Sequence, residues 1–230
     1  MSTASERQSP RGVGRPRETV LSRDRIVAAG LTLLDEVGPE GFSMAALAAR
    51  MSVRPSSFYN HVSGKEDVLD GIQELITDSI DASMFDERPW TEAVTAWARG
   101  YRAAFIAHPR AITLFATMPV KGAIRTLHMY EHVVLGFRRA GWPEERIIPA
   151  MVALESFILG SALDATAPTD VLSPGAAAEA VPDFAAAVAA HDEALQRTGG
   201  SPADAAFEEG LTALVTGLSA SLQGGDGLTD

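Results

Sequence analysis

The sequence contains no cysteine, few aromatic residues and no long uninterrupted apolar run. Without cysteine there is no disulfide, no thiolate zinc site and no cysteine nucleophile, so nothing indicates secretion. Residues 1–9 lack the apolar core of a signal peptide, and no run of 18 apolar residues offers a transmembrane span. We therefore expect a cytoplasmic chain with no membrane partner.

The charges are divided unequally along the chain. The 230 residues are 46% apolar and 21% charged, a composition typical of a globular protein with one large domain or two small ones. The net charge of −11 alone argues against a nucleic-acid partner, because phosphate binding depends on lysine and arginine. Residues 1–65, however, hold nine Lys and Arg against six Asp and Glu, whereas residues 66–230 hold ten against twenty-four. A basic N-terminal part therefore precedes an acidic body.

Apolar residues repeat at helical intervals along most of the chain. No segment alternates with the period of two that predicts a strand, and no hairpin signal separates two apolar runs. We therefore expect an all-α protein of about nine helices.

Two short helices with a tight connection are predicted near the N-terminus. Ser43 is placed to cap a helix over 44–50, and Phe42 and Leu47 are spaced as a hydrophobic staple. After a turn of three to four residues, Pro55 suits the first position of a second short helix. This layout is typical of a helix-turn-helix unit, whose second helix enters the DNA major groove.

The second short helix, which extends to about residue 61, has a polar face. Phe58 and Val62 lie four apart and are expected to pack inward, which leaves the solvent side to Arg54, Ser56, Ser57, Tyr59, Asn60 and His61. A helical hairpin with a polar surface is the alternative interpretation. Ser63 with Glu66 then predicts a capping box that opens a long helix over 65–84.

Residues 23–71 resemble the DNA-binding domain of the tetracycline-repressor (TetR) family of transcriptional regulators. The similar segments are RDRIVAAGLTLLDEVGPEGFSMAALAARMSV and PSSFYNHVSGKEDVLDGI. The resemblance implies phosphate contacts by Ser43, Tyr59, His61 and Lys65. It implies base contacts by Arg54, Ser56, Ser57 and Asn60.

The chain departs from the family pattern at two positions of this unit. Ser52 replaces the usual turn glycine, at a place that requires a left-handed backbone. Arg54 replaces the usual Ser or Thr cap, a change that loses a cap but offers a further base or phosphate contact.

Residues 14–17, Gly-Arg-Pro-Arg, form a short cationic segment ahead of this domain. Arg15 and Arg17 are predicted to enter the DNA minor groove beside the recognition helix. The alternative is a tail that only improves solubility.

Two apolar helix faces in the acidic body predict a homodimer. Residues 147–163 are apolar on nearly every side, which indicates burial by the chain's own core and by a second subunit. The last helix has a coiled-coil-like seam of Phe207, Leu211, Leu214 and Leu218. A symmetric four-helix interface would place two recognition helices one turn apart on a palindromic operator in double-stranded DNA.

The body also resembles the C-terminal domain of the tetracycline-repressor class. The similar segments are PWTEAVTAWARGYRAAFIAHP, LESFILGSALD and FEEGLTALVTGLSA. The resemblance implies a cavity for a small hydrophobic or aromatic effector, lined by Trp97, Tyr101, Phe115, Met118, Met151 and Asp164. Phe115 stands near the family's histidine for magnesium–tetracycline, so that complex is not the expected effector. The alternative for the aromatic stripe over 97–105 is an ordinary packed core.

No metal, no other cofactor and no catalytic residue are expected. His128 and His132 lie four apart on one helix face, but the sequence offers no obvious third ligand. The leading hypothesis is a ligand-responsive transcriptional repressor. The alternatives are a DNA-binding regulator without a ligand and an all-α metal-dependent enzyme. We divide the chain into a flexible basic arm (1–20), a helix-turn-helix DNA-binding domain of three helices (21–68) and a helical ligand-binding and dimerisation domain (69–225).

Overall fold

The protein is described by a computed structural model over residues 21–223. Within that range the chain forms ten α-helices and three short 3₁₀ helices, and it has no strand. The all-α prediction is confirmed. The elements beyond the expected nine helices are short turns of helix, such as α4 (Met84–Glu87) and α6 (Ile112–Phe115).

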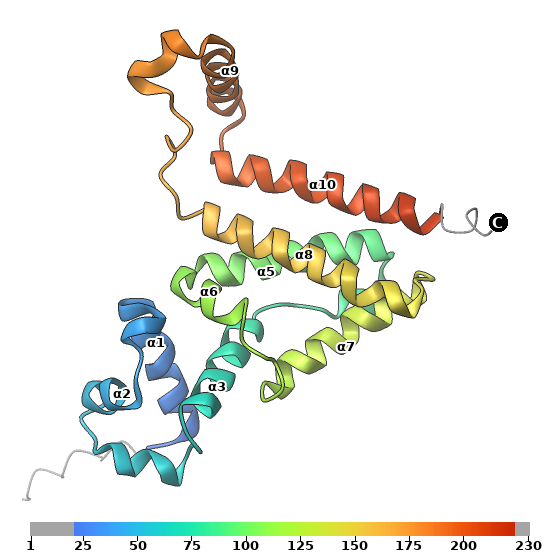
Figure 1. The fold of residues 1–230 in the computed structure, drawn as a ribbon. Coiled ribbons are helices and arrows are strands. Elements are labelled where there is room, and N and C mark those ends of the chain that lie inside the picture. The colour runs from blue at the N-terminus through green and yellow to red at the C-terminus, as the bar shows by residue number, and fades with distance from the viewer. Residues whose placement is uncertain (1–20, 224–230) are drawn as a thin grey trace, which may run out of the picture.

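Three elements pack together at one end of the molecule, namely α1 (Arg23–Gly41), α2 (Met44–Arg50) and η1 (Pro55–Asn60) (Figure 1). The predicted cap of α2 is present, because the Ser43 hydroxyl accepts a hydrogen bond from the Ala46 amide at 3.1 Å. The staple residues on either side of that cap are buried with the rest of the domain core: Ile26, Leu34, Phe42, Leu47, Phe58 and Ile72.

Two details of this domain differ from the sequence prediction. The segment after the turn is a 3₁₀ helix rather than an α-helix. The predicted Ser63–Glu66 capping box is wrong, because Gly64 is the N-cap of α3 (Lys65–Thr77) and the third helical residue is therefore Asp67. The Asp67 carboxylate accepts the Ser63 amide hydrogen bond at 2.9 Å.

Helix α3 ends at Thr77, earlier than the expected residue 84. The Thr77 hydroxyl lies 3.0 Å from the carbonyl oxygen of Gln73 and 2.7 Å from the hydroxyl of Thr126. After this point the chain turns, and the Asp81 carboxylate accepts a hydrogen bond from the Ser83 amide at 2.8 Å. Side-chain bonds to the backbone thus replace the helix that periodicity predicts.

The body is built around α5 (Trp90–Ile106), which packs against α7 (Ile124–Arg139), α8 (Glu144–Asp164) and α10 (Pro202–Gln223). The η2 turn (Pro109–Ala111) leads from α5 to α6. The aromatic stripe of α5 is buried, and its rings contact one another and neighbours on other helices. Most of this stripe is therefore packed core.

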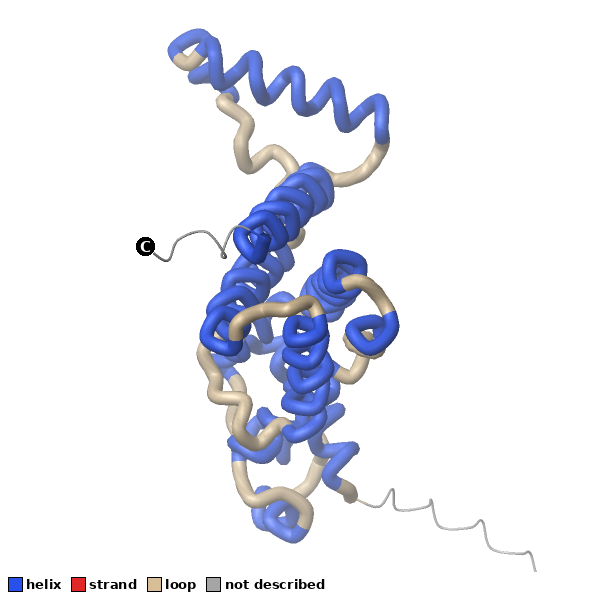
Figure 2. Tube along the Cα trace, turned by 90° about the vertical axis from the view of Figure 1, so that its right-hand side faces the viewer, coloured by secondary structure: helices blue, strands red, loops and turns tan. Residues whose placement is uncertain are grey.

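The segment between α8 and α10 stands away from the body. It contains η3 (Gly175–Ala180), inside the stretch expected to be a loop, and α9 (Pro182–Thr198). Figures 1 and 2 both show α9 projecting at the end opposite α2. None of the residues in α9 is buried, so its own chain leaves this helix largely uncovered.

Among residues 21–223, α8 alone is long and apolar enough to cross a membrane by length and composition. It packs against α5, α7 and α10, and it includes the acidic residue Glu155 in its middle. These contacts are those of a core helix in a helical bundle.

Candidate DNA interface and effector cavity

The turn between α2 and η1 orients a polar surface outward. Ser52 has a φ of 56°, so the position expected to need a left-handed residue does adopt that conformation with serine. Phe58 and Val62 are buried at 0% and 3% exposure and attach η1 to the domain core. Because these two side chains point inward, the other side chains of the segment face solvent.

The structure brings the predicted recognition residues together on that surface. Tyr59 is 63% exposed, an unusual position for a large aromatic side chain. Ser57 is half-buried, and the others are exposed: Arg54, Ser56, Asn60 and His61. This is a compact patch of hydrogen-bonding groups with one protruding ring.

Two further predicted phosphate-binding residues lie near each other, at the junction of α1 and α2. The Lys65 ammonium donates a hydrogen bond to the carbonyl oxygen of Phe42 at 3.0 Å and lies over the Phe42 ring. Ser43 is the next residue and is exposed, as is Lys65. One hydrogen bond positions the ammonium group and leaves two of its protons for an anion. Arg15 and Arg17 lie outside the described residues.

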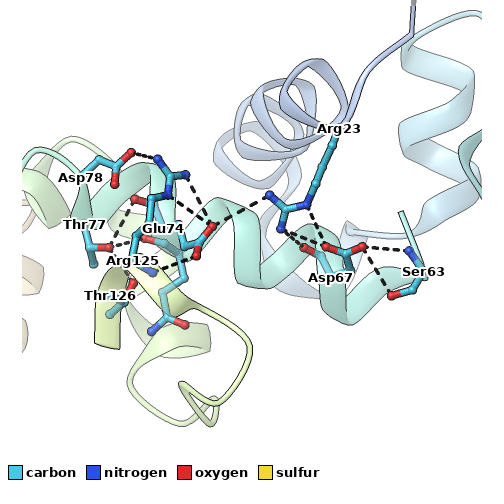
Figure 3. Close-up of polar contacts among 9 residues, drawn as sticks. Arg23, Ser63, Asp67, Glu74, Thr77, Asp78, Arg125 and Thr126 are labelled. Atoms are coloured by element: carbon cyan, nitrogen blue, oxygen red, sulfur yellow. Dashed lines mark hydrogen bonds and ion pairs between the residues drawn. The ribbon is translucent and has the colours of Figure 1, made fainter. Parts of the chain in front are cut away.

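Helix α3 joins this domain to the body through a set of polar contacts that the sequence did not predict (Figure 3). Arg23 of α1 lies 3.0 Å from Asp67 and 3.9 Å from Glu74. Arg125 of α7 donates its backbone N–H to Glu74 at 3.0 Å and pairs through its guanidinium group with Glu74 and Asp78. The nearly buried Glu74 carboxylate therefore connects the first helix of one domain to a helix of the other.

Two carboxyl groups of the same helix have pKa values shifted in opposite directions, because burial and neighbouring acids raise the pKa of Asp70. Burial tends to raise the pKa of Asp67, but hydrogen bonds from Ser63 and Arg23 outweigh it and lower that pKa. A second connection joins α1 to η2, since His108 lies 2.9 Å from Asp35 and Arg110 bonds to the Glu36 carbonyl. Two polar connections thus link the domains, beside the apolar core that runs through both.

A cavity of about 420 Å³ lies in the body beside α3. Three of the predicted effector-binding residues line it: Tyr101, Phe115 and Met118. Its apolar wall also includes Ile112, Val120 and Leu159. Gln73 of α3 lines the cavity as well, so a molecule bound there would touch the helix that leads to the DNA-binding domain.

The other predicted cavity residues lie elsewhere. Trp97 and Met151 are buried in the core outside the lining, where the Trp97 indole N–H donates to the Met129 sulfur at 3.2 Å. Asp164 is exposed and lines a separate hollow of about 330 Å³ between α8 and α10. Helical spacing places these residues on the correct helices, but it does not distinguish a cavity wall from the core behind it.

Most of the polar part of the cavity wall consists of residues that were not predicted. Glu155, Tyr130 and Gln73 line the cavity together with Tyr101. Burial raises the pKa of Glu155, although the nearby hydroxyl groups of Tyr130 and Tyr101 favour its ionised form. Burial also raises the pKa of both tyrosines, which are neutral donors. The signal available in the sequence was a single acid inside the apolar run 147–163.

The two histidines of α7 do not form a metal site in the described part of the chain. His132 lies 2.9 Å from the Asp86 carboxylate, while His128 is exposed. No group of three or more metal-ligating side chains occurs within residues 21–223.

The fold and surface define a helix-turn-helix protein with a helical, cavity-bearing body. A family model for bacterial regulatory proteins of the tetR family matches residues 26–72, and a model for the tetracyclin repressor-like C-terminal domain matches residues 86–222. The chain belongs to the TetR family of transcriptional regulators.

Curated relatives include an HTH-type transcriptional regulator of Saccharopolyspora erythraea, which is 30% identical over 62% of this chain and 60% of its own length. The tetracycline repressor protein class A of Escherichia coli is 29% identical over 87% of this chain and 92% of its own length. Among solved structures, a possible TetR family transcriptional regulator from Streptomyces coelicolor A3(2) matches with a TM-score of 0.68 and 28% identity, covering 86% of this chain and 99% of its own.

Proposed function

We propose that the protein is a homodimeric repressor of the bacterial cytoplasm that binds a palindromic operator and leaves it when a small hydrophobic or aromatic molecule occupies the cavity. The main supporting observation is the position of α3. Gln73 lines the cavity, and the next residue, Glu74, pairs with Arg23 of the DNA-binding domain and Arg125 of the body. A ligand therefore acts directly on the element that joins the two domains.

DNA binding is supported by the exposed patch on η1 and by the charge distribution. The patch presents hydrogen-bonding groups for base edges and phosphates around the protruding Tyr59. The body has an excess of acidic residues and repels phosphate, so it restricts DNA contact to the helix-turn-helix end.

Dimerisation is supported by apolar surface that the single chain leaves uncovered. On α8, Ile148 is 58% exposed, and Phe184 of α9 is 45% exposed. Val152 and Leu163 are 53% and 48% exposed and also line the cavity, so an interface on this face would border the cavity. The outer face of α10 has a row of exposed small residues that permits close helix approach: Ala206, Ala213, Gly217 and Ala220. A second copy that covers these faces would form the predicted four-helix interface.

The seam proposed for α10 takes part in the chain's own core instead. Leu211 is 1% exposed, and the ring of Phe207 stacks on Phe157 of α8 with centroids 5.6 Å apart. Leu214 and Leu218 are half-buried against the same core. The surface left for a partner is therefore the opposite, small-residue side of the helix.

Ligand-induced release follows from differential affinity. A molecule that binds more tightly to a domain arrangement unsuited to DNA shifts the population toward it and weakens operator binding by the same factor.

Selection of bound sequences from random double-stranded DNA tests the proposal. We expect enrichment of an inverted repeat whose half-sites lie about one helical turn apart. A compound library is then screened for release of that DNA and for a rise in melting temperature. An enriched single half-site contradicts the dimer, and compounds that raise the melting temperature without releasing DNA favour the ligand-independent alternative.

A further inference from the structure

Two buried hydrogen-bond acceptors in the cavity wall are unpaired within residues 21–223. The side-chain oxygen Oε1 of Gln73 and the oxygen Oε1 of Glu155 are both almost fully buried, and neither accepts a hydrogen bond from a described residue. Gln73 as a whole is only 4% exposed. Because buried polar atoms are normally paired, two unpaired acceptors in one cavity wall indicate that a bound molecule supplies the donors.

The cavity wall also lacks positive charge. Among the described residues that line it, none is lysine, arginine or histidine, and Glu155 is the only carboxylate. A carboxylate or phosphate on the ligand would therefore be buried beside an acid and without a counter-charge. This composition disfavours an anionic effector.

The remaining classes of ligand differ in how many N–H or O–H protons they can donate to the two unpaired acceptors. A hydroxyl group has one proton and can satisfy only one of the two acceptors, whereas a protonated amine has two or three. The amine also supplies the charge that a buried carboxylate lacks, and a hydrogen bond between ionised groups is stronger than a neutral one. The pKa of Glu155, raised by burial, is lowered again by such a neighbour.

We propose that the effector is a protonated organic amine on an apolar or aromatic body, with its N–H groups bonded to Gln73 Oε1 and Glu155 Oε1. This inference rests on the proposed role of the cavity as the effector site. The body of the ligand would lie against the apolar part of the wall, where Phe115 and Met118 are found.

Three probes of the same shape test the ligand class, namely 2-naphthylmethylamine, 2-naphthylmethanol and 2-naphthoate. Their affinities for the full chain are measured by isothermal titration calorimetry at neutral pH. We expect the amine to bind at least about tenfold more tightly than the alcohol, and the naphthoate to bind most weakly. The Glu155→Gln variant should lose this preference for the amine. The control Glu131→Gln removes an exposed acid of α7 and should keep it.

Several results would overturn the inference. They are failure of the amine to bind, naphthoate binding as tightly as the amine, and an amine preference that survives in Glu155→Gln. The comparison of the three probes on the unaltered protein decides the question even if the variant folds poorly. Operator binding by the unaltered protein without probe is measured in parallel. Loss of that binding contradicts the proposed function, whereas intact operator binding without an amine preference contradicts only the ligand class.

Discussion

At the scale of single residues, burial separates the side chains that build the DNA-binding domain from those available to DNA. Phe58 is fully buried, while the adjacent Tyr59 is 63% exposed. The sequence predicted this division because a four-residue spacing identifies an inward face. It also predicted that Ser52 needs a left-handed backbone, which the φ of 56° matches. It did not identify Gln73 or Glu155 as cavity residues, because both lie on helices whose other residues pack in the core.

Replacing Tyr59 with alanine is expected to weaken operator binding without destabilising the fold. A hydrogen bond to a charged phosphate contributes about 1.5–3 kcal/mol, roughly ten- to a hundredfold in affinity. The side chain makes little contact with the core, so the melting temperature should hardly change. Fluorescence anisotropy with labelled operator measures the first effect and circular dichroism the second.

The matched control is Leu172→Ala, which removes a side chain that is 65% exposed between α8 and η3. It should leave operator affinity unchanged. Equal affinity of Tyr59→Ala and the unaltered protein would contradict the assignment of η1 as the recognition segment.

The raised pKa of Glu155 predicts a specific dependence of stability on pH. Because the pKa is higher in the folded than in the unfolded chain, the folded state binds a proton more tightly, and stability is lost as pH rises through the folded pKa. Glu155→Gln removes this loss. The melting temperature of the variant relative to the unaltered protein should therefore increase from pH 5 to pH 8, measured without effector.

The control for this prediction is Glu131→Gln, which removes an exposed acidic side chain of α7. The melting temperature of this variant relative to the unaltered protein should change less between pH 5 and pH 8 than that of Glu155→Gln. A difference that stays constant or shrinks as the pH rises would be inconsistent with a carboxyl group destabilised by burial.

At the scale of elements, the sequence predicted the start of most helices better than their ends and their mutual contacts. Caps and prolines are local signals, and Ser43 precedes α2 and Pro55 opens η1 as expected. Thr77, the last residue of α3, makes a hydrogen bond to Thr126, 49 residues away, and no local pattern encodes this contact. The ion pairs of Glu74 are equally distant in sequence.

The connection between α3 and α7 can be measured as a coupling energy. A double-mutant cycle of Glu74→Gln and Arg125→Gln, followed by urea unfolding, should give about 1 kcal/mol of interaction, because Glu74 is nearly buried and Arg125 is half-exposed. The control cycle uses Arg88 and Glu92, an exposed pair 3.9 Å apart on adjacent turns. That pair should give less than about 0.5 kcal/mol. Equal coupling in the two cycles would contradict the role of Glu74 as the link between domains.

At the scale of the whole molecule, the distribution of charge is more informative than its sum. The net charge of −11 hides a basic N-terminal part and an acidic body, and the division agrees with DNA contact at one end. The sequence of a helix that projects with no buried residue resembles that of a helix that lies on the protein surface. The projecting position of α9 was therefore not predicted. Its uncovered face, with those of α8 and α10, favours a second subunit.

A charged residue on the outer face of α10 is expected to separate the subunits. Ala213 is exposed in the single chain, so Ala213→Arg should leave each subunit folded and yield monomers in analytical ultracentrifugation. The control Ala103→Arg places the same charge on an exposed position of α5 and should remain dimeric. The monomers of Ala213→Arg should lose affinity for the inverted repeat. If this variant remained dimeric, the four-helix interface would be contradicted.

Occupation of the cavity and binding of operator DNA are expected to oppose each other. The most direct test measures the affinity of a cavity ligand for the free protein and for the protein saturated with operator. We predict weaker ligand binding in the presence of operator, by the same factor by which the ligand weakens DNA binding, because the coupling free energy is reciprocal. Equal ligand affinity with and without operator would contradict the account.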